Sequence, residues 1–124
     1  MRRSLFLLAF AIFPSLAAAQ SSDLDATCET VAKNFLLTDK IAVGTVQSFP
    51  ELKPPGVRMT YSTRENTAKA DMTDTFECEF ESSAKPHHLT RFCVSTTCYA
   101  PTGDDVDRKR RLEEMRILLE RAEK

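Results

Sequence analysis

Residues 72–81 alternate between apolar and polar side chains with a period of two. The apolar positions include Phe76, Cys78 and Phe80, and the polar positions include Glu77, Glu79 and Glu81. Because successive side chains of a strand point to opposite faces, this pattern predicts a half-buried β-strand. We expect it to form the middle of a small sheet, with the rest of the chain packed on its aromatic face. Parity also places Asp74 on the inward side, at the edge of the core.

Three further segments predict strands. Residues 41–49 are partly apolar and β-branched but contain Gly44, which favours a weak, bulged strand. Residues 57–62 alternate cleanly, and residues 89–96 carry the last strand pattern. The polar stretches between these segments predict loops, so we expect an antiparallel meander of three or four strands.

Two segments have the spacing of amphipathic helices. The first follows the capping residues 21–23, and its apolar stripe includes Leu24, Cys28, Val31 and Phe35. The second runs from about Val106 to near the end of the sequence, and its stripe is Leu112, Met115, Leu119 and Ala122. Because this stripe is narrow and the charges around it balance, we expect the second helix to be the least stable element. Truncation after Gly103 is then expected to leave most of the sheet intact.

Residues 1–19 have the order of a cleavable secretory signal: a basic start, an apolar run and the small residues 17–19. The segment is too short to span a membrane, and the first cysteine, Cys28, is too distant for a lipid anchor. We therefore expect a mature chain that begins at Gln20 and lies in the periplasm or outside the cell, without a stable membrane anchor. The alternative is a buried N-terminal helix.

Removal of this signal leaves 105 residues, enough for one domain with a modest core. We expect residues 20–103 to form a disulfide-bonded helix-plus-sheet domain and residues 104–124 to form the charged C-terminal helix. The mature chain carries 15 basic and 18 acidic residues, a net charge of −3. This balance argues against general affinity for nucleic acid or anionic lipid.

Four cysteines in a small exported chain predict two disulfides, and they are Cys28, Cys78, Cys93 and Cys98. A zinc site is disfavoured, because such sites usually contain two close cysteine pairs and only Cys93 and Cys98 lie close in sequence. A thioredoxin-like redox site needs a C-x-x-C motif, which the sequence lacks.

Strand register bears on how the cysteines pair. Opposed residues of an antiparallel pair have numbers with a constant sum, and a sum of 170 places Cys78 opposite Phe92. The same register places Glu79 opposite Arg91, a favourable charge pair on the polar face. Cys78 and Cys93 have an odd sum, so without a bulge they point to opposite faces and a bridge between them is disfavoured.

This register leads us to expect one bridge between Cys28 and Cys78, which joins the first helix to the sheet. The second bridge is then Cys93–Cys98, which requires the chain to turn back at residues 95–97. The alternative is Cys28–Cys98 with Cys78–Cys93, which a bulge would permit.

The remaining polar side chains predict ordinary surface roles. His87 and His88 lie in a polar, proline-bearing loop and predict a solvated turn, with a metal or pH-sensing site as the alternative. The three glutamates of residues 77–81 predict a solvated strand face rather than an acid–base pair. The side chains of the basic run 108–111 spread around the circumference of a helix. They therefore predict a solvated helix, with an interaction surface as the alternative.

The sequence contains no recognisable catalytic, cofactor-binding or metal-binding motif. No serine lies in a G-x-S-x-G motif, and three glycines leave no phosphate-binding loop. We therefore predict an α+β fold with an N-terminal helix, a meander sheet, a C-terminal helix and two disulfides.

The functional hypothesis is an exported, non-enzymatic domain that binds a protein or an envelope component, such as an inhibitor, an immunity protein or an accessory subunit. One alternative is a small hydrolase with a site between helix and sheet. Another is a structural envelope protein that oligomerises through its C-terminal helix.

Overall fold

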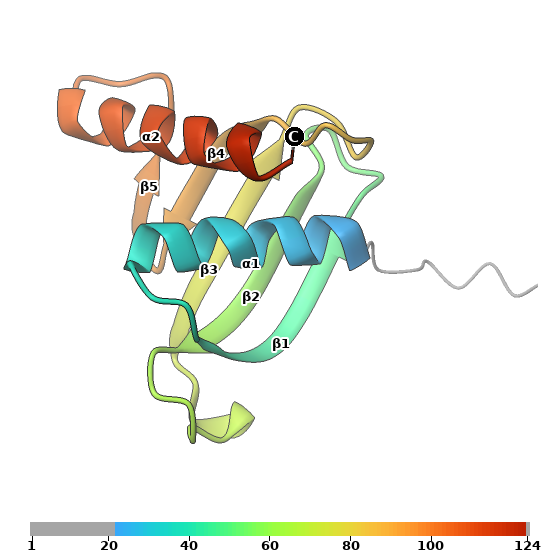
Figure 1. Ribbon diagram of the computed structural model, residues 1–124, viewed down its shortest axis with the longest axis vertical. Helices are drawn as coiled ribbons and strands as arrows, with labels where there is room; N and C mark the ends of the chain where they lie inside the picture. The colour runs from blue at the N-terminus through green and yellow to red at the C-terminus, as the bar shows by residue number, and fades with distance from the viewer. Residues whose placement is uncertain (1–21, 124) are drawn as a thin grey trace, which may run out of the picture.

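A computed structural model describes residues 22–123 of the chain (Figure 1). The predicted signal, residues 1–19, and the predicted mature start at Gln20 lie outside the described residues. The elements, in chain order, are α1 (Ser22–Leu36), β1 (Ala42–Phe49), β2 (Gly56–Ser62), a short 3-10 helix η1 (Lys69–Asp71), β3 (Asp74–Phe80), β4 (Leu89–Val94), β5 (Thr97–Tyr99) and α2 (Val106–Ala122).

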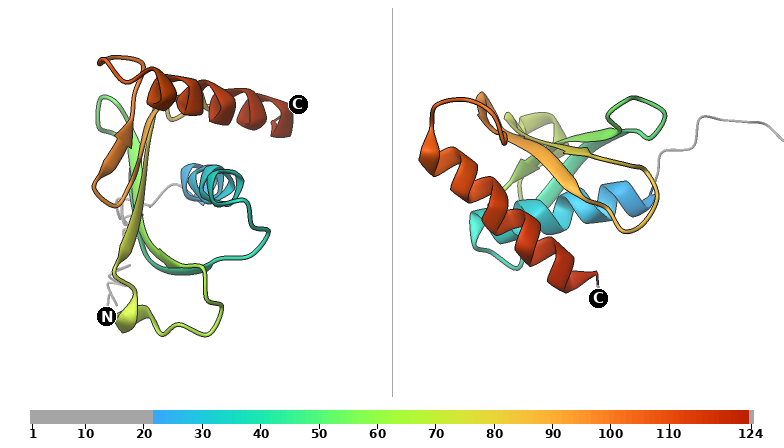
Figure 2. Two further views of the ribbon diagram at one scale, coloured as in Figure 1. Left: turned by 90° about the vertical axis from the view of Figure 1, so that its left-hand side faces the viewer. Right: turned by 90° about the horizontal axis from the view of Figure 1, so that it is seen from above.

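The fold is α+β, with a five-stranded antiparallel sheet whose strand order is β1-β2-β3-β4-β5. Both helices lie on the same side of this sheet, which Figure 2 shows most clearly in its left-hand view. Helix α1 packs on β1, β2 and β3, whereas α2 packs on β4 and β5 and also contacts α1. The domain therefore has two layers, and within the described residues no helix covers the other face of the sheet.

The predicted position and register of β3 are confirmed. The strand lies in the middle of the sheet, with Cys78 opposite Phe92 and Glu79 opposite Arg91. The Arg91 guanidinium donates a hydrogen bond to the Glu79 carboxylate over 3.1 Å, on the face away from the helices. The register shifts by one residue after Glu79, so that Phe80 pairs with Leu89.

The bulge expected in the first strand is also present, because the register of β1 shifts between Val43 and Val46. Gly44 lies at this point with its backbone close to the side chains of Thr60 and Met72. A Cβ atom at Gly44 would clash with both side chains, which explains why a glycine occupies an otherwise strand-like segment.

The sheet has one strand more than the predicted three or four. The segment expected as a single strand over residues 89–96 ends at Val94, and the chain turns back through Ser95, whose φ is 51°. Thr97–Tyr99 then pairs with β4 as the edge strand β5. This is the early turn that a Cys93–Cys98 bridge requires, and both predicted disulfides, Cys28–Cys78 and Cys93–Cys98, are present.

The core lies between the sheet and the helices, and aromatic rings fill much of it. Phe92 lies nearly parallel to both Phe76 and Tyr99, with ring centroids 5.7 and 4.6 Å apart. Phe35 of α1 contacts Phe92 and Tyr99 edge-on. The Cys28–Cys78 disulfide lies in this same core and joins α1 to β3.

Helix α2 packs on the sheet and on α1, and its apolar stripe is part of the core. Leu112, Met115 and Leu119 of the predicted stripe are buried, whereas Ala122 is exposed. Asp105 caps the helix by accepting a hydrogen bond from the backbone N–H of Arg108. The expectation that α2 is the least stable element rested on a narrow exposed stripe, and burial of that stripe removes the basis for it. Among residues 22–123, no helix combines the length and the apolar character that a membrane span requires.

Candidate functional site

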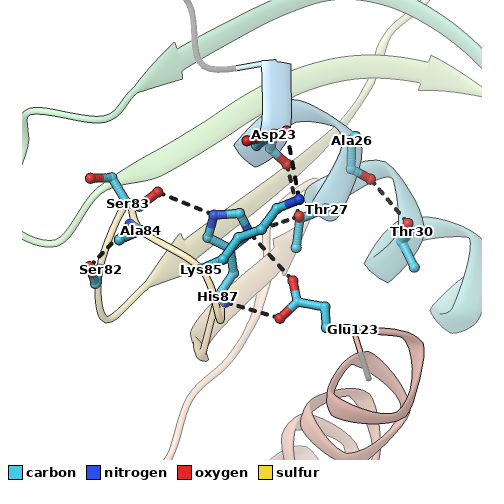
Figure 3. Close-up of polar contacts among 10 residues, drawn as sticks. All are labelled: Asp23, Ala26, Thr27, Thr30, Ser82, Ser83, Ala84, Lys85, His87 and Glu123. Carbon is cyan, nitrogen blue, oxygen red and sulfur yellow. Dashed lines mark hydrogen bonds and ion pairs between the residues drawn. The ribbon is translucent and has the colours of Figure 1, made fainter.

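The side chain of His87 is buried, contrary to the prediction of a solvated turn. Only 1% of the residue is exposed, and it lies where the β3–β4 loop meets both helices (Figure 3). The loop sequence is polar, but α1 and the last turn of α2 close over it. His88 follows the prediction more closely, because its side chain is about half exposed and lies 3.9 Å from Glu120.

Both ring nitrogens of His87 have polar neighbours. Nε2 lies 3.2 Å from the Ser83 carbonyl oxygen, which accepts hydrogen bonds only, so Nε2 carries a proton. Nδ1 lies 3.0 Å from the Thr27 hydroxyl and 3.3 Å from a carboxylate oxygen of Glu123. The backbone N–H of His87 also donates to Glu123, over 3.0 Å. These contacts join α1, the β3–β4 loop and the C-terminal end of α2.

The single hydroxyl proton of Thr27 has two acceptors within reach. It can be donated to a bare Nδ1, or to the Asp23 carbonyl oxygen, which lies 2.8 Å away. In the second case the Thr27 oxygen and the Glu123 carboxylate both face Nδ1 as acceptors. The hydrogen bonds on this side of the ring therefore depend on one hydroxyl proton that cannot serve both acceptors.

A groove that begins beside the partners of His87 runs along the surface between α1 and α2. It consists of three adjoining hollows of about 340, 480 and 360 Å³. The first and second share Thr30, and the second and third share Asn34, Leu37 and Leu118. We call this surface the interhelix groove.

The two ends of the interhelix groove differ in chemistry. One end lies beside His87 and is lined by Asp23, Thr27, Lys85 and Glu123. There the ammonium of Lys85 lies 3.9 Å from the Asp23 carboxylate. Figure 3 shows the two side chains directed toward each other. The other end is apolar and is lined by Leu37, Met115, Ile117 and Leu118, with Arg111 and Glu114 at its border.

The apolar end exposes side chains that small domains normally bury. Leu37 is 88% exposed, Ile117 is 42% exposed and Leu118 is 39% exposed. Leu37 follows the last turn of α1 with a φ of 54°, a conformation that a bulky residue rarely adopts. That backbone carries the Leu37 side chain to the end of the groove instead of into the core.

A second acidic group, Asp25, faces β1 from the first turn of α1. Burial raises the pKa of its carboxyl group, and a hydrogen bond with the Ser48 side chain offsets part of that rise. One carboxylate oxygen, Oδ1, is buried without a hydrogen-bond partner. Asp25 is thus a carboxylate in a site that disfavours its charge.

The glutamates of the central strand have structural partners on the outer face. Glu77 pairs with Arg58 across β2 and β3 at 3.3 Å, and Glu79 pairs with Arg91. Both side chains are partly exposed, which agrees with the predicted polar face. Asp74 lies on the inward face of β3, opposite the buried Tyr61, as parity predicts, but it is exposed because it is the first residue of the strand, where the core ends. It remains close enough to Tyr61 to add to the rise that burial causes in the pKa of that phenol.

The basic run 108–111 does not form one charged surface. Arg108 pairs with Asp105, Arg110 pairs with Asp107 and Glu114, and Arg111 pairs with Glu114. Arg111 also lies over the ring of Phe35, 4.9 Å from its centroid. These side chains point to different partners around the helix, which agrees with the predicted solvated helix.

Within the part of the chain that the structure describes, no group of three or more histidine, cysteine or acidic side chains is placed to hold a metal ion. The chain matches no protein-family model, no curated protein and no solved structure in the comparisons made. The residues of the site are therefore the only basis for a functional argument.

Sequence reasoning missed the His87 site, because its partners Thr27 and Glu123 lie far away in the chain. The helical stripe of α2 did indicate its apolar residues, but a stripe cannot show that Leu118 and Ile117 stay outside the core. The one local indication of the groove was that Leu37 and Leu118 lie beside, and not within, the main stripes of their helices.

Proposed function

We propose that this chain is an exported binding domain without catalytic activity, and that it holds a protein partner in the interhelix groove. The observation that carries the proposal is the apolar end, where three exposed aliphatic side chains surround one hollow. Exposed aliphatic side chains that converge on a concave surface are typical of interaction sites.

The shape of the groove favours one kind of occupant, an amphipathic helix of the partner protein. Two helices already form its walls, and a third helix can lay apolar side chains between them. Leu37 and Leu118 would contact the apolar face of that helix. Asn34 lines the same stretch and can hydrogen-bond to its polar margin.

Charges at the groove do not select a strongly charged partner. Arg111 is paired with Glu114, and Lys33 is paired with Glu29 over 3.2 Å. With these charges paired, most of the binding energy must come from apolar contact. An envelope protein with an exposed apolar helix is the class of partner that fits this surface.

A photo-crosslinking amino acid at Asn34, in the chain starting at Gln20, tests for a partner in envelope extract. The matched control places the same amino acid at Leu52, which is also exposed but lies on the β1–β2 hairpin. We expect a crosslinked protein from the Asn34 position that is absent from the Leu52 position. Equal crosslinking from both positions would contradict the proposal.

Affinity for the purified partner gives a second test. The double change Leu37→Ser and Leu118→Ser is expected to weaken binding by about tenfold or more, since two apolar contacts are lost. The change Val106→Ser is the control, because Val106 is 74% exposed and does not line the groove. Light scattering of the purified chain separates this proposal from self-association through α2, which would give a dimer that Leu118→Ser dissociates.

A hydrolase is the second candidate, and one observation favours it. The Thr27 hydroxyl lies 3.0 Å from His87 Nδ1, while the other ring nitrogen is oriented by the Ser83 carbonyl oxygen. This is the order of a nucleophile, a base and an orienting group. The Thr27 hydroxyl also lies within hydrogen-bond distance of the Asp23 carbonyl, and the His87 side chain is fully covered, so substrate access is poor. Ester hydrolysis that Thr27→Val abolishes without loss of stability would favour the hydrolase over the binding domain.

A further inference from the structure

The two disulfides of the domain lie in different surroundings. Cys28 and Cys78 are buried between α1 and β3, with at most 1% of either residue exposed. Cys93 and Cys98 are directly opposed on β4 and β5, at the edge of the sheet. Cys93 is buried, but Cys98 is partly exposed because β5 is the edge strand. Of the four cysteines, Cys98 is therefore the one that is most exposed to a reagent in solution.

A positive charge lies beside the sulfur of Cys98. The guanidinium of Arg91 donates from Nη2 to Cys98 Sγ over 3.1 Å. Its other nitrogen, Nη1, donates to the Glu79 carboxylate, which fixes the side chain in this position. A cation next to a cysteine sulfur stabilises the thiolate relative to the thiol, and the thiolate is the reactive form in disulfide exchange.

The other charges near this bridge lie on the outer face of the sheet. Glu77 is the strand partner of Cys93, and its carboxylate is paired with Arg58. Glu79 is paired with Arg91 itself. The Glu79 carboxylate thus holds the Arg91 guanidinium beside Cys98. It contacts the guanidinium and not the sulfur.

We propose that Cys93–Cys98 is a redox-active disulfide that exchanges with a dithiol reductant, and that Arg91 stabilises the Cys98 thiolate. This inference is independent of the interhelix groove. It assigns a reactive site to the sheet edge, and its substrate class is a small or protein-borne dithiol.

The exchange has two steps. A thiolate of the dithiol attacks Cys98 Sγ, the Cys93–Cys98 bond breaks, and its electron pair leaves on Cys93, which takes a proton from water. The second thiol of the reductant loses its proton to water. The resulting thiolate attacks the first sulfur of the reductant, which is bound to Cys98 in the mixed disulfide. That bond breaks, and its electron pair leaves on Cys98 beside Arg91. The dithiol is oxidised to a disulfide by two electrons, and the Cys93–Cys98 pair is reduced by two electrons.

Limited reduction of the folded mature chain tests accessibility. The protein is treated with graded dithiothreitol, quenched with iodoacetamide and mapped by mass spectrometry. We expect Cys93 and Cys98 to be alkylated about tenfold faster or more than Cys28 and Cys78, because exchange depends on access to the sulfur. Reduction of both bridges at one rate, or reduction of Cys28–Cys78 first, would overturn the proposal.

The role of Arg91 is tested on the selectively reduced protein at neutral pH. Arg91→Gln is expected to slow alkylation of Cys98 by about threefold to tenfold, and Arg91→Lys is expected to restore most of the rate, since it keeps the charge. Arg58→Gln is the matched control, because it removes an outer-face ion pair that does not contact sulfur. If Arg91→Gln only loosened the hairpin, alkylation would become faster. A faster or unchanged rate would therefore refute the role of Arg91.

Discussion

The carboxylate of Glu123 accepts a hydrogen bond from the backbone N–H of His87 and lies 3.3 Å from the Nδ1 atom of its ring. One side chain at the end of α2 therefore satisfies two polar groups of a buried loop. The contact ties the last turn of the C-terminal helix to the connection between β3 and β4. Loss of Glu123 would leave the buried N–H of His87 without a protein acceptor.

The change Glu123→Ala is accordingly expected to lower the free energy of unfolding by about 1–3 kcal/mol, the cost of an unsatisfied buried polar group. Glu120→Ala is the control, because Glu120 contacts only the half-exposed His88 at 3.9 Å and should cost about 0–1 kcal/mol. Urea unfolding followed by circular dichroism measures both. Equal losses in the two variants would show that the buried contact contributes nothing beyond surface charge.

Burial of the α2 stripe leads to a prediction about the C-terminal helix. Leu119→Ala is expected to lower the free energy of unfolding by about 2–5 kcal/mol, whereas Leu118→Ala should lower it by less because Leu118 is partly exposed. Truncation after Gly103 is now expected to abolish cooperative unfolding, the reverse of the outcome expected from the sequence. A truncated chain with a sharp thermal transition would contradict the packing of α2.

The two disulfides should differ in their contribution to stability. Cys28–Cys78 joins residues 50 apart, and the chain-entropy model gives it about 4 kcal/mol. Cys93–Cys98 joins residues 5 apart, and the same model gives about 2 kcal/mol. Paired Cys→Ala variants of each bridge, unfolded in guanidinium chloride, measure the difference. A larger loss from the Cys93–Cys98 pair would mean that the edge hairpin has a role the entropy model omits.

Asp25 gives a prediction for pH. Burial raises the pKa of its carboxyl group in the folded chain above the usual 3.8, so the folded state disfavours the charged form. Well below pH 3.8 the carboxyl group is protonated in both the folded and the unfolded state, and it does not change the free energy of unfolding. As the pH rises from 3.8 through the higher folded pKa, the unfolded state loses its proton first and stability falls. Above the folded pKa that loss is complete.

Asp25→Asn removes this charge and can keep the hydrogen bond to Ser48. We therefore expect a higher melting temperature at pH 7 and a difference from the wild type that shrinks as the pH falls toward 3.8. Thermal melts across this range test the prediction. A variant less stable than the wild type at pH 7 would show that the carboxylate is favourable in the folded protein.

The parts of the fold that followed from the sequence depend on side-chain parity along a strand. The alternation of residues 72–81 gave the faces of β3, and the charge pair between Glu79 and Arg91 supported one register. The same parity disfavoured a Cys78–Cys93 bridge, and together with the position of Cys28 on the helical stripe it led to the observed pairing. These inferences succeeded because each depends on the local repeat of a strand or a helix, which determines which side chains face the core.

The site was not predictable in the same way. Burial of His87 depends on Thr27 and Glu123, which come from opposite ends of the described chain, and the polar loop around it resembles any exposed turn. The docking of α2 depends on the shape of the surface left by α1 and the sheet. Such properties arise from packing between distant elements, and one sequence carries no local record of them.

The nearest-neighbour order of the sheet implies an order of folding. Each strand pairs with the next strand in the chain, so the sheet can form by closing short loops, which has a small entropic cost. Helix α1 precedes every strand, yet the surface that buries it also includes Phe92 of β4, Tyr99 of β5 and helix α2, so it is complete only after these later elements have joined. We expect the amides of β2 and β3 to gain protection before those of α1 in pulsed hydrogen exchange during refolding with the disulfides intact. An N-terminal helix that is made first is then assembled into the domain late.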